Sequence, residues 1–368
     1  MKILWILDLQ GGEGGTESVT LRLDAAVTSR GNQFVTVLTG ASWKNRNWES
    51  KLSKVYIGSA LVPMRIYTLP KVLVPFVRYI KDIIRWEKPD IIVANWAPMV
   101  LVLRRILRWT GYHGNSNIIV YEHGAFARLS SGSILYRWIY RQGVKESDHV
   151  ICGGDDYAIE IEKIGSNVMV SAIGLPITVR KNLIPRSNNV FYIVFVGRLE
   201  NKQKRVDRLL KACSLLPSGI DWLLQIIGDG PDRVALENMA YVLNVEKHVI
   251  WSGWQSDPWS LIDSASILAF PSDFEGFSAV MIEAMAHGLP VLSTDCDFGP
   301  RSIIAEGVNG WLVDRNDQAF AQKLQQLAIG EVSLPNQESI ARTVDRFNID
   351  QVAERFLGVC EKVRQSQQ

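Results

Sequence analysis

One continuous stretch, residues 266–295, restricts the fold more than any other part of the chain. It combines a short apolar segment over 266–270, helical spacing of apolar residues over 277–287 and a second apolar segment from Val291. A Gly-Leu-Pro sequence separates the last two, because glycine favours the end of a helix and proline cannot continue one. This order of strand, helix and strand predicts a βαβ unit of a parallel sheet.

Two glutamates lie in this unit, Glu275 at the expected start of the helix and Glu283 eight residues later. At about 1.5 Å of rise per residue, they would lie roughly 12 Å apart along the helix axis and within about 80° of one face. A single glutamate is usually a solvated surface residue. Both of these lie among apolar residues near the carboxyl end of a predicted strand, where α/β proteins bind ligands. The spacing therefore favours one elongated polar ligand over one metal ion.

Strand and helix patterns alternate along the whole chain. In the first half, strands are predicted at residues 35–38, 90–94, 117–121 and 149–152. In the second half, they are predicted at residues 191–196, 222–227, 248–252, 266–270, 290–294 and 311–313. The 368 residues exceed the usual size of one hydrophobic core. We therefore predict two doubly wound Rossmann-like domains, over residues 1–180 and 190–345, joined by a polar linker, with a final helix within 346–368.

The composition excludes several classes of protein. No apolar run reaches the roughly 20 residues that a membrane-spanning helix needs. The first residues, Met1–Asp8, are too short and too soon acidic for a signal peptide and read as a strand. The four cysteines lack C-x-x-C spacing and predict neither a zinc site nor a disulfide framework. We expect a cytoplasmic protein.

The net charge of +2 conceals an uneven distribution. Residues 51–145 hold 15 Lys and Arg against 4 Asp and Glu, and aromatic residues alternate with the basic ones. Basic and aromatic surfaces are typical of proteins that associate with the membrane interface. Nucleic acid is the alternative partner for such a charge, but the chain has no recognised nucleic-acid motif. We predict that the N-terminal domain binds an anionic membrane surface, on the inner face of the cytoplasmic membrane, and that the protein binds no nucleic acid.

Several motifs together resemble the retaining glycosyltransferases of family 4. Glu275 and Glu283 have the E-x7-E spacing of that family. The other shared pieces are Val196-Gly-Arg198, Gln203-Lys-Arg-Val206, Gly228-Asp-Gly230, Trp251-Ser-Gly-Trp-Gln255, Phe274-Glu-Gly-Phe277 and Val308-Asn-Gly310. The likeness covers most of the C-terminal half and parts of the N-terminal half, and is greatest to the bacterial lipopolysaccharide galactosyltransferases. It implies the GT-B fold, an α/β architecture in which two Rossmann-like domains face each other across a cleft.

The resemblance also implies roles for individual residues. Arg198 and Lys204 would hold the diphosphate of a nucleotide-sugar donor and supply positive charge as the leaving diphosphate becomes more negative. Glu283 would accept hydrogen bonds from the ribose, and Glu275 would lie near the transferred sugar. The remaining donor contacts that it implies are Gly14, Gly15, Trp254, Gly276, Phe277 and Ser278.

Some of these positions have a structural interpretation as well. The glycine-rich segment with Gly14 and Gly15 is not G-x-G-x-x-G, so it is either a phosphate-binding loop or a flexible turn. His123 follows a predicted strand, and a histidine here in the family lies close to the transferred sugar, although a lone histidine is more often structural. Lys202 and Arg205 flank Lys204 and leave open which cation meets the diphosphate.

A second acidic motif, Asp295-Cys-Asp297, has the D-x-D pattern that binds a divalent metal in the other major glycosyltransferase fold. It follows a predicted strand and precedes a Gly-Pro-Arg loop that family 4 also has. We interpret the match as coincidental and expect no metal or other cofactor. The donor would be a nucleotide sugar.

The resemblance implies a catalytic set of His123, Arg198, Lys204 and Glu275, and a retaining, metal-independent transferase. We expect it to move a hexose, with galactose favoured, from a UDP-sugar to a lipid-linked, lipopolysaccharide or surface-polysaccharide acceptor. Another donor, such as a UDP-N-acetylhexosamine or GDP-mannose, is an alternative. So are an epimerase or a phosphorylase of the same fold, and a non-catalytic subunit of a polysaccharide assembly complex.

Overall fold

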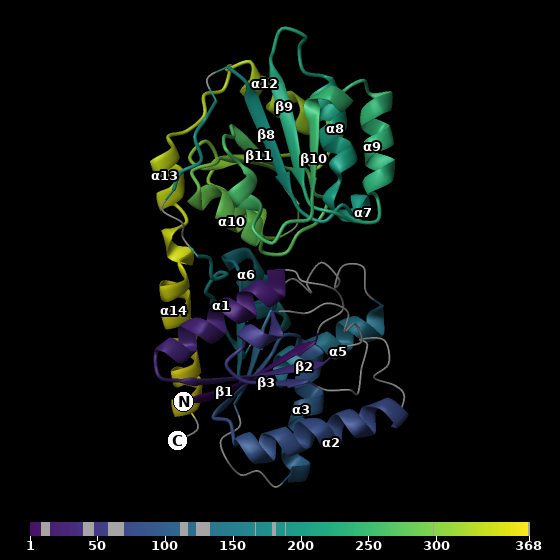
Figure 1. Ribbon diagram of the computed structural model, residues 1–368. Coiled ribbons are helices and arrows are strands. Elements are labelled where there is room, and N and C mark those ends of the chain that lie inside the picture. The colour runs from purple at the N-terminus through teal and green to yellow at the C-terminus, as the bar shows by residue number, and fades with distance from the viewer. Residues whose placement is uncertain are drawn as a thin grey trace. The chain divides into compact units, whose positions relative to one another are not determined.

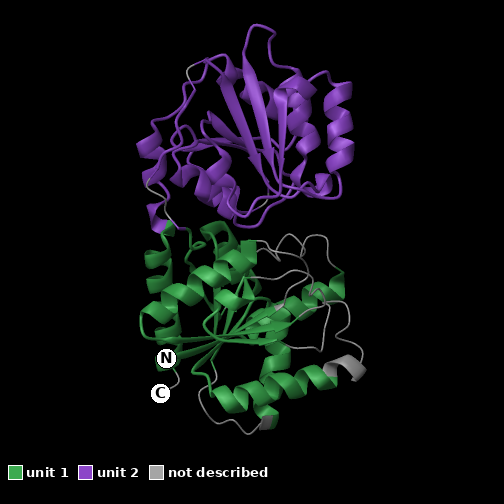
Figure 2. Ribbon diagram, viewed as in Figure 1, with its two compact units in different colours: residues 1–177, 347–368 green, residues 178–346 purple. Residues whose placement is uncertain are grey.

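The computed structural model describes residues 1–8, 15–39, 48–57, 70–110, 117–122, 133–165, 167–178, 182–187, 189–296 and 298–366. The chain divides into two compact units, shown in Figures 1 and 2. The first unit comprises residues 1–177 with 347–368, and the second comprises residues 178–346.

Within the described residues, the first unit contains a seven-stranded parallel sheet in the order β3-β2-β1-β4-β5-β6-β7. Its strands are β1 (Lys2–Asp8), β2 (Gln33–Thr39), β3 (Val55–Ile57), β4 (Ile91–Ala94), β5 (Asn117–Tyr121), β6 (His149–Cys152) and β7 (Met169–Ala172). The central strands are continuous apolar runs, and every residue of β4 is buried. Such runs are expected where helices cover both faces of a parallel sheet.

The helices of the first unit form two groups around its sheet (Figure 1). They are α1 (Gly15–Ser29), α2 (Pro70–Glu87), α3 (Ala97–Thr110), α5 (Ile134–Lys145), α6 (Asp155–Ile164) and α14 (Ile349–Gln365). Helix α3 packs against α2 and α5, whereas α1 packs against α14. The Phe356 ring of α14 lies 6.0 Å from the Trp5 ring and 6.2 Å from the Tyr121 ring. The last helix of the chain is therefore part of the core of the first unit.

The second unit contains, within the described residues, a six-stranded parallel sheet in the order β10-β9-β8-β11-β12-β13. Its strands are β8 (Phe191–Val196), β9 (Trp222–Ile227), β10 (Val249–Gly253), β11 (Ile267–Phe270), β12 (Val291–Thr294) and β13 (Gly310–Val313). The chain builds outward from β8 to β10, then returns to place β11 directly beside β8. The strand order reverses between these two strands, and open α/β sheets bind their ligands beyond the carboxyl ends of the strands at such a point.

The helices of the second unit are α7 (Asn201–Lys204), α8 (Val206–Ser214), α9 (Arg233–Val242), α10 (Ala279–Ala286), α11 (Pro300–Ile303), α12 (Asp317–Ala328) and α13 (Gln337–Arg342). Helix α8 packs against α9 and α12, and α10 packs against α13. Leu209 of α8, Leu236 of α9 and Leu324 of α12 meet Phe195 and Leu224 of the sheet in one buried cluster. This core holds β8 and β9 rigidly beneath the loops that follow them.

The structure confirms the predicted doubly wound α/β fold and departs from the sequence analysis in detail. Strand β3, helix α6 and strand β7 were not predicted, and the residues of β3 and β7 are half-buried or exposed rather than buried. Helix α10 begins at Ala279, two residues later than predicted, because Ser278 has an extended backbone with ψ 109°. No helix in the described ranges is long and apolar enough to cross a membrane.

Candidate functional site

Two loops at the centre of the second sheet bring together predicted site residues that are distant in sequence. Arg198 and Lys204 follow β8, and Glu275 follows β11. Because β8 and β11 are hydrogen-bonded neighbours and parallel, the loops after them meet at one edge of the sheet. This edge is the point where the strand order reverses and is the candidate ligand site of the second unit.

Lys204 and Glu275 form an ion pair at this edge. The Lys204 Nζ atom lies 2.7 Å from Glu275 Oε1, and the two side chains are only 15% and 7% exposed. The ammonium also lies 4.8 Å from the centroid of the Phe270 ring, within the range of a cation–π interaction. A charge pair so shielded from water needs both partners, since removing one leaves an uncompensated buried charge.

Hydrogen bonds between the two loops fix the position of this pair. The backbone N–H of Asp273 donates to the Gln203 carbonyl at 2.9 Å, and Gln203 Nε2 donates to the Phe274 carbonyl at 3.2 Å. The Lys204 backbone N–H donates to Glu200, which closes the short helix α7. The ion pair therefore lies on a backbone that is already held in place on both sides.

Glycines bring the loop after β9 onto the loop after β8. Gly228 has a φ of +150°, and a Cβ atom there would lie 1.9 Å from the Gly197 carbonyl oxygen. The Gly197 N–H donates to Ile227 and the Leu199 N–H donates to Asp229, both at 3.0 Å. The Gly-Asp-Gly motif thus supports the backbone on either side of Arg198.

Arg198 and Trp254 are more exposed than the Lys204 pair. The Arg198 side chain is 61% exposed and lies 3.7 Å from the Glu200 carboxylate. Trp254 follows β10 and is 56% exposed.

The cations next to Lys204 in the sequence have other surroundings. Lys202 is exposed, whereas Arg205 is bound to Asp207 and Asp273. Of the cations around α7, Lys204 alone is paired with Glu275 among the ion pairs that the structure describes.

Glu283 is half-buried in the second turn of α10. Its Oε2 atom accepts a hydrogen bond from the indole Nε1–H of Trp259 at 3.1 Å. Glu275 lies four residues before the first residue of α10, so the rise of a continuous helix does not give its distance from Glu283. The estimate of roughly 12 Å from helical geometry in the sequence analysis is therefore wrong in its premise.

The segment between the two glutamates packs against the loop after β12. Gly299 has a φ of +87°, and a Cβ atom there would lie 2.1 Å from the Gly276 carbonyl oxygen. Phe277 is buried, and Ser278 is the N-cap residue of α10, although its side chain caps no backbone N–H. The backbone of Gly276, Phe277 and Ser278 is thus part of the same edge of the sheet as Glu275.

The D-x-D motif follows β12 at this edge. Asp295 accepts two hydrogen bonds from Arg301, at 2.6 and 2.7 Å, in a bidentate ion pair. Burial, followed by the negative charge of Glu275, raises the pKa of the Cys296 thiol to about 12. Asp297 lies outside the described residues. Within the part of the chain that is described, no three His, Cys, Asp or Glu side chains form a group that could hold a metal ion.

A charge network behind the candidate site was not found by sequence reasoning. Arg208 of α8 is 2% exposed. Its guanidinium donates to the Pro271 carbonyl at 2.6 Å, to Asp273 at 2.9 Å and to Asp317 at 2.9 Å. Burial opposes ionisation of Asp317, but hydrogen bonds from Arg208 and Lys211 outweigh it and lower the pKa of that carboxyl. Arg208 thus fixes the first residues of the loop that carries Glu275. Nothing in the sequence indicated this role, because Arg208 there is only an arginine at helical spacing.

We expect Arg208→Met to destabilise the second unit by about 3–5 kcal/mol, because Asp273 and the Pro271 carbonyl lose a buried charged donor. Urea unfolding measures this change. The matched control is Lys211→Met, since Lys211 binds the same Asp317 at 3.1 Å but is 43% exposed, and exposed pairs contribute about 0–1 kcal/mol. Equal destabilisation by the two variants would contradict the role given to Arg208.

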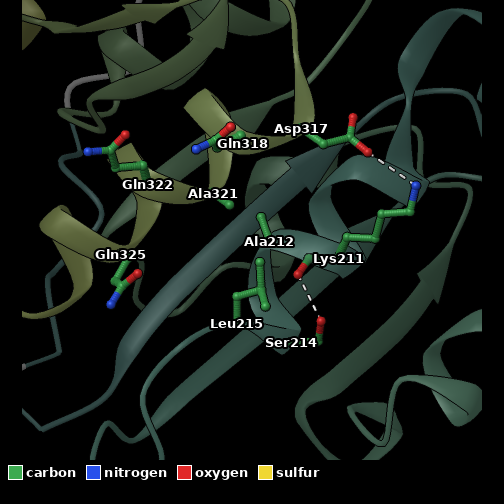
Figure 3. A pocket seen from close by; sticks show the side chains of 9 residues that line it. All are labelled: Lys211, Ala212, Ser214, Leu215, Asp317, Gln318, Ala321, Gln322 and Gln325. Carbon is green, nitrogen blue, oxygen red and sulfur yellow. Dashed lines mark hydrogen bonds and ion pairs between the residues drawn. The ribbon is translucent and has the colours of Figure 1, made fainter.

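A surface cavity of about 610 Å³ lies between α8 and α12 (Figure 3). Its lining includes the Lys211–Asp317 ion pair, and Gln318, Gln322 and Gln325 of α12. None of the residues that line this cavity is a predicted site residue. The candidate site is therefore defined by the strand ends and not by the cavity.

The predicted residues of the first unit are only partly described. Gly14 and His123 lie outside the described residues, and Gly15 is the first residue of α1. Glu122, which directly precedes His123, is 2% exposed. Its Oε2 atom accepts a hydrogen bond from the Tyr140 hydroxyl at 2.7 Å. The roles predicted for Gly14, Gly15 and His123 stay predictions.

Comparison with protein-family models now identifies the chain. Residues 13–170 match the model "Glycosyltransferase Family 4", and residues 180–344 match the model "Glycosyl transferases group 1". Together the two matches cover nearly the whole of both units. The chain belongs to the family 4 glycosyltransferases. The family resemblance drawn from the sequence motifs is confirmed.

Individual relatives agree with this family membership. Lipopolysaccharide 1,6-galactosyltransferase of Escherichia coli is 32% identical over 220 residues, which cover 55% of this chain. The chain spans 60% of the length of that relative. Among solved structures, the apo form of a lipopolysaccharide outer core galactosyltransferase aligns with a TM-score of 0.82 and 24% identity, over 98% of this chain and 99% of the other. Anabaena HepE in complex with UDP aligns with a TM-score of 0.79 and 18% identity, over 98% and 100%. These two structures share the GT-B fold with this chain.

Proposed function

We propose that this chain is a retaining hexosyltransferase that uses a UDP-sugar donor and needs no metal ion. The observation that carries the proposal is the shielded pair of Lys204 and Glu275 where the strand order of the second sheet reverses. Open α/β sheets bind nucleotides at such a point. A fixed ammonium there offers a counter-charge for a diphosphate.

The proposed reaction breaks the bond between the sugar C1 atom and the diphosphate oxygen. The acceptor hydroxyl forms a new bond to C1 on the face from which the diphosphate leaves, and its proton passes to an oxygen of that diphosphate. Lys204 and Arg198 stabilise the negative charge that develops on the leaving group, because fixed cations require little reorganisation during the reaction. No carboxylate of the protein forms a covalent intermediate in this scheme.

The two glutamates take separate parts in this proposal. Glu283 accepts hydrogen bonds from the ribose hydroxyls, and Glu275 contacts the sugar while it holds Lys204 in place.

The bidentate pair of Asp295 with Arg301 supports a metal-independent reaction, because that carboxylate already has a cationic partner. Activity that persists in excess EDTA is the expected result for the purified protein, and loss of activity in EDTA would contradict metal independence.

The donor specificity is tested by isothermal titration calorimetry in the presence of EDTA. We expect UDP to bind more tightly than GDP or ADP, and UDP-galactose to bind at least as tightly as UDP-glucose and the N-acetylhexosamine donors. The 1,6-galactosyltransferase relative supports galactose, and the UDP complex of HepE supports the uridine nucleotide. Preference for GDP would overturn the donor. Absence of nucleotide binding would favour a non-catalytic subunit.

The acceptor in this proposal is a lipid-linked or lipopolysaccharide glycan, reached by binding of the first unit to the inner face of the cytoplasmic membrane. Helices α2, α3 and α5 expose large apolar side chains, with Trp86 72%, Trp109 71% and Trp138 57% exposed. Exposed arginines directly precede these tryptophans, at Arg85, Arg108 and Arg137, and the exposed Arg141 follows Trp138 by three residues. Indole rings and cations together favour the headgroup region of an anionic bilayer.

We expect the double variant Arg137→Gln/Arg141→Gln to bind anionic vesicles about tenfold or more weakly, since each basic residue near such a surface contributes about 1 kcal/mol. Flotation with phosphatidylglycerol vesicles at low salt measures the bound fraction. The control Lys247→Gln/Arg342→Gln removes the same charge from exposed positions of the second unit. Equal loss in both double variants would show a non-specific charge effect and would contradict a membrane surface on α5.

A further inference from the structure

We infer that Trp259 is a positioning residue for donor binding, which fixes the Glu283 carboxylate for the ribose hydroxyls. This inference rests on the proposed function. Trp259 lies in the short helix η3 (Pro258–Leu261), which follows β10 and belongs to neither of the loops that carry Lys204 and Glu275. Its indole N–H donates to Glu283 Oε2 at 3.1 Å.

The chemistry of the two side chains makes this contact directional. An indole has one N–H group and can only donate, so a buried tryptophan needs one acceptor at one place. Trp259 is 8% exposed, and the acceptor at this place is Glu283. A carboxylate has about four acceptor positions, and the indole uses one of them. The hydrogen bond therefore restricts rotation of the Glu283 side chain while leaving it able to accept from a ligand.

A second ring packs against Trp259. The His287 ring lies 5.3 Å from the Trp259 ring, at an interplanar angle of 32°. His287 is 7% exposed, and its Nδ1 atom lies 3.0 Å from the Asn182 carbonyl. His287 follows Glu283 by one helical turn, and the Ile184 N–H donates to the His287 carbonyl at 3.0 Å. Trp259 thus contacts both the carboxylate that it binds and a ring that is itself anchored.

The test compares the binding of UDP with that of 2′-deoxy-UDP and 3′-deoxy-UDP by calorimetry in EDTA. For the wild type, we expect UDP to bind about tenfold or more tightly than at least one deoxy analogue. We expect Glu283→Ala to bring this ratio close to one, and Trp259→Phe to lower it by about threefold to tenfold. In the Glu283→Ala background, Trp259→Phe should change the ratio no further, because both variants act on the same carboxylate.

The ratio separates positioning from a general structural role. A loosened second unit would weaken UDP and its deoxy analogues equally, and an unchanged ratio in Trp259→Phe would overturn the inference. His287→Ala, which removes the ring that packs against Trp259, provides a second variant and should lower the same ratio by a smaller factor. If Trp259→Phe does not fold, an unchanged ratio in His287→Ala overturns the inference.

The matched control is Trp222→Phe. Trp222 is also buried in the second unit, and its ring lies 4.6 Å from the ring of His248. It is the first residue of β9, whereas the candidate site lies at the carboxyl ends of the strands. We expect it to leave the ratio unchanged. A wild type that binds UDP without distinguishing the deoxy analogues would overturn the ribose role of Glu283 and this inference. A wild type that binds no UDP would refute the proposed donor itself.

Discussion

Replacing Lys204 with methionine is expected to lower kcat/KM about 100- to 1,000-fold, as the loss of one fixed charge-stabilising group does in other enzymes. The variant removes the ammonium that lies 2.7 Å from Glu275 and 4.8 Å from the centroid of the Phe270 ring, and keeps an unbranched side chain of similar length. Transfer of radiolabelled sugar measures the rate. Calorimetry with UDP measures the accompanying loss of affinity, which we expect to be at least tenfold because the diphosphate loses a cationic partner.

The control for this prediction lies on the same short helix. Lys202 is two residues earlier, is exposed, and carries the same charge. Lys202→Met should retain nearly full activity and UDP affinity. The double variant Lys204→Met/Glu275→Gln should be more stable to urea than Lys204→Met alone, because it no longer contains a buried carboxylate without its cation. Equal activity of the Lys202 and Lys204 variants would contradict the role proposed for Lys204.

Replacing Gly228 with alanine is expected to destabilise the second unit by about 3 kcal/mol or more, from backbone strain and steric overlap together. Its φ of +150° disfavours any residue with a Cβ atom, and that atom would lie 1.9 Å from the Gly197 carbonyl oxygen. The loop that carries Arg198 would have to move away from β9. Urea unfolding measures the stability, and UDP titration under native conditions measures the loss of donor binding.

Gly219 gives the matched control for Gly228. It precedes the same strand, β9, and a Cβ atom there would meet nothing within 4 Å. Gly219→Ala should change the unfolding free energy by less than about 1 kcal/mol, with a small gain from the reduced entropy of the unfolded chain. A Gly228→Ala variant as stable as Gly219→Ala would show that the two loops do not pack as closely as the backbone geometry requires.

The sequence predicted the elements whose pattern depends on burial alone. The buried strands β8 and β11 were located almost to the residue, because they are apolar runs flanked by turn residues. Strand β3 was missed because its apolar run is only three residues long, and β7 because Ser171 interrupts its apolar residues. Both are edge strands whose residues are only partly buried. The start of α10 was predicted too early because the apolar Phe277 fits the helical spacing, although the backbone becomes helical only at Ala279.

The candidate site, too, was only partly predicted from the sequence. The sequence pattern identified Glu275 and Glu283 as polar residues in apolar surroundings near a strand end, and the family resemblance implied Lys204. The sequence could not distinguish Lys204 from its neighbours Lys202 and Arg205, because all three are cations within four residues and differ only in the side chains that they contact. In the fold, Glu275 binds Lys204, whereas Asp207 and Asp273 bind Arg205. Which of these cations meets the diphosphate stays a prediction.

The sequence by itself determined the fold class, the family and the identity of the polar residues near the strand ends, because these follow from short-range periodicity and local motifs. Only the tertiary structure decided which of those residues are partners. The ion pair of Lys204 with Glu275, the support of the Glu275 loop by Arg208, and the hydrogen bond from Trp259 to Glu283 each join residues between 24 and 71 positions apart. Such contacts depend on the order of strands in the sheet, and that order is set by the packing of whole elements rather than by any local pattern.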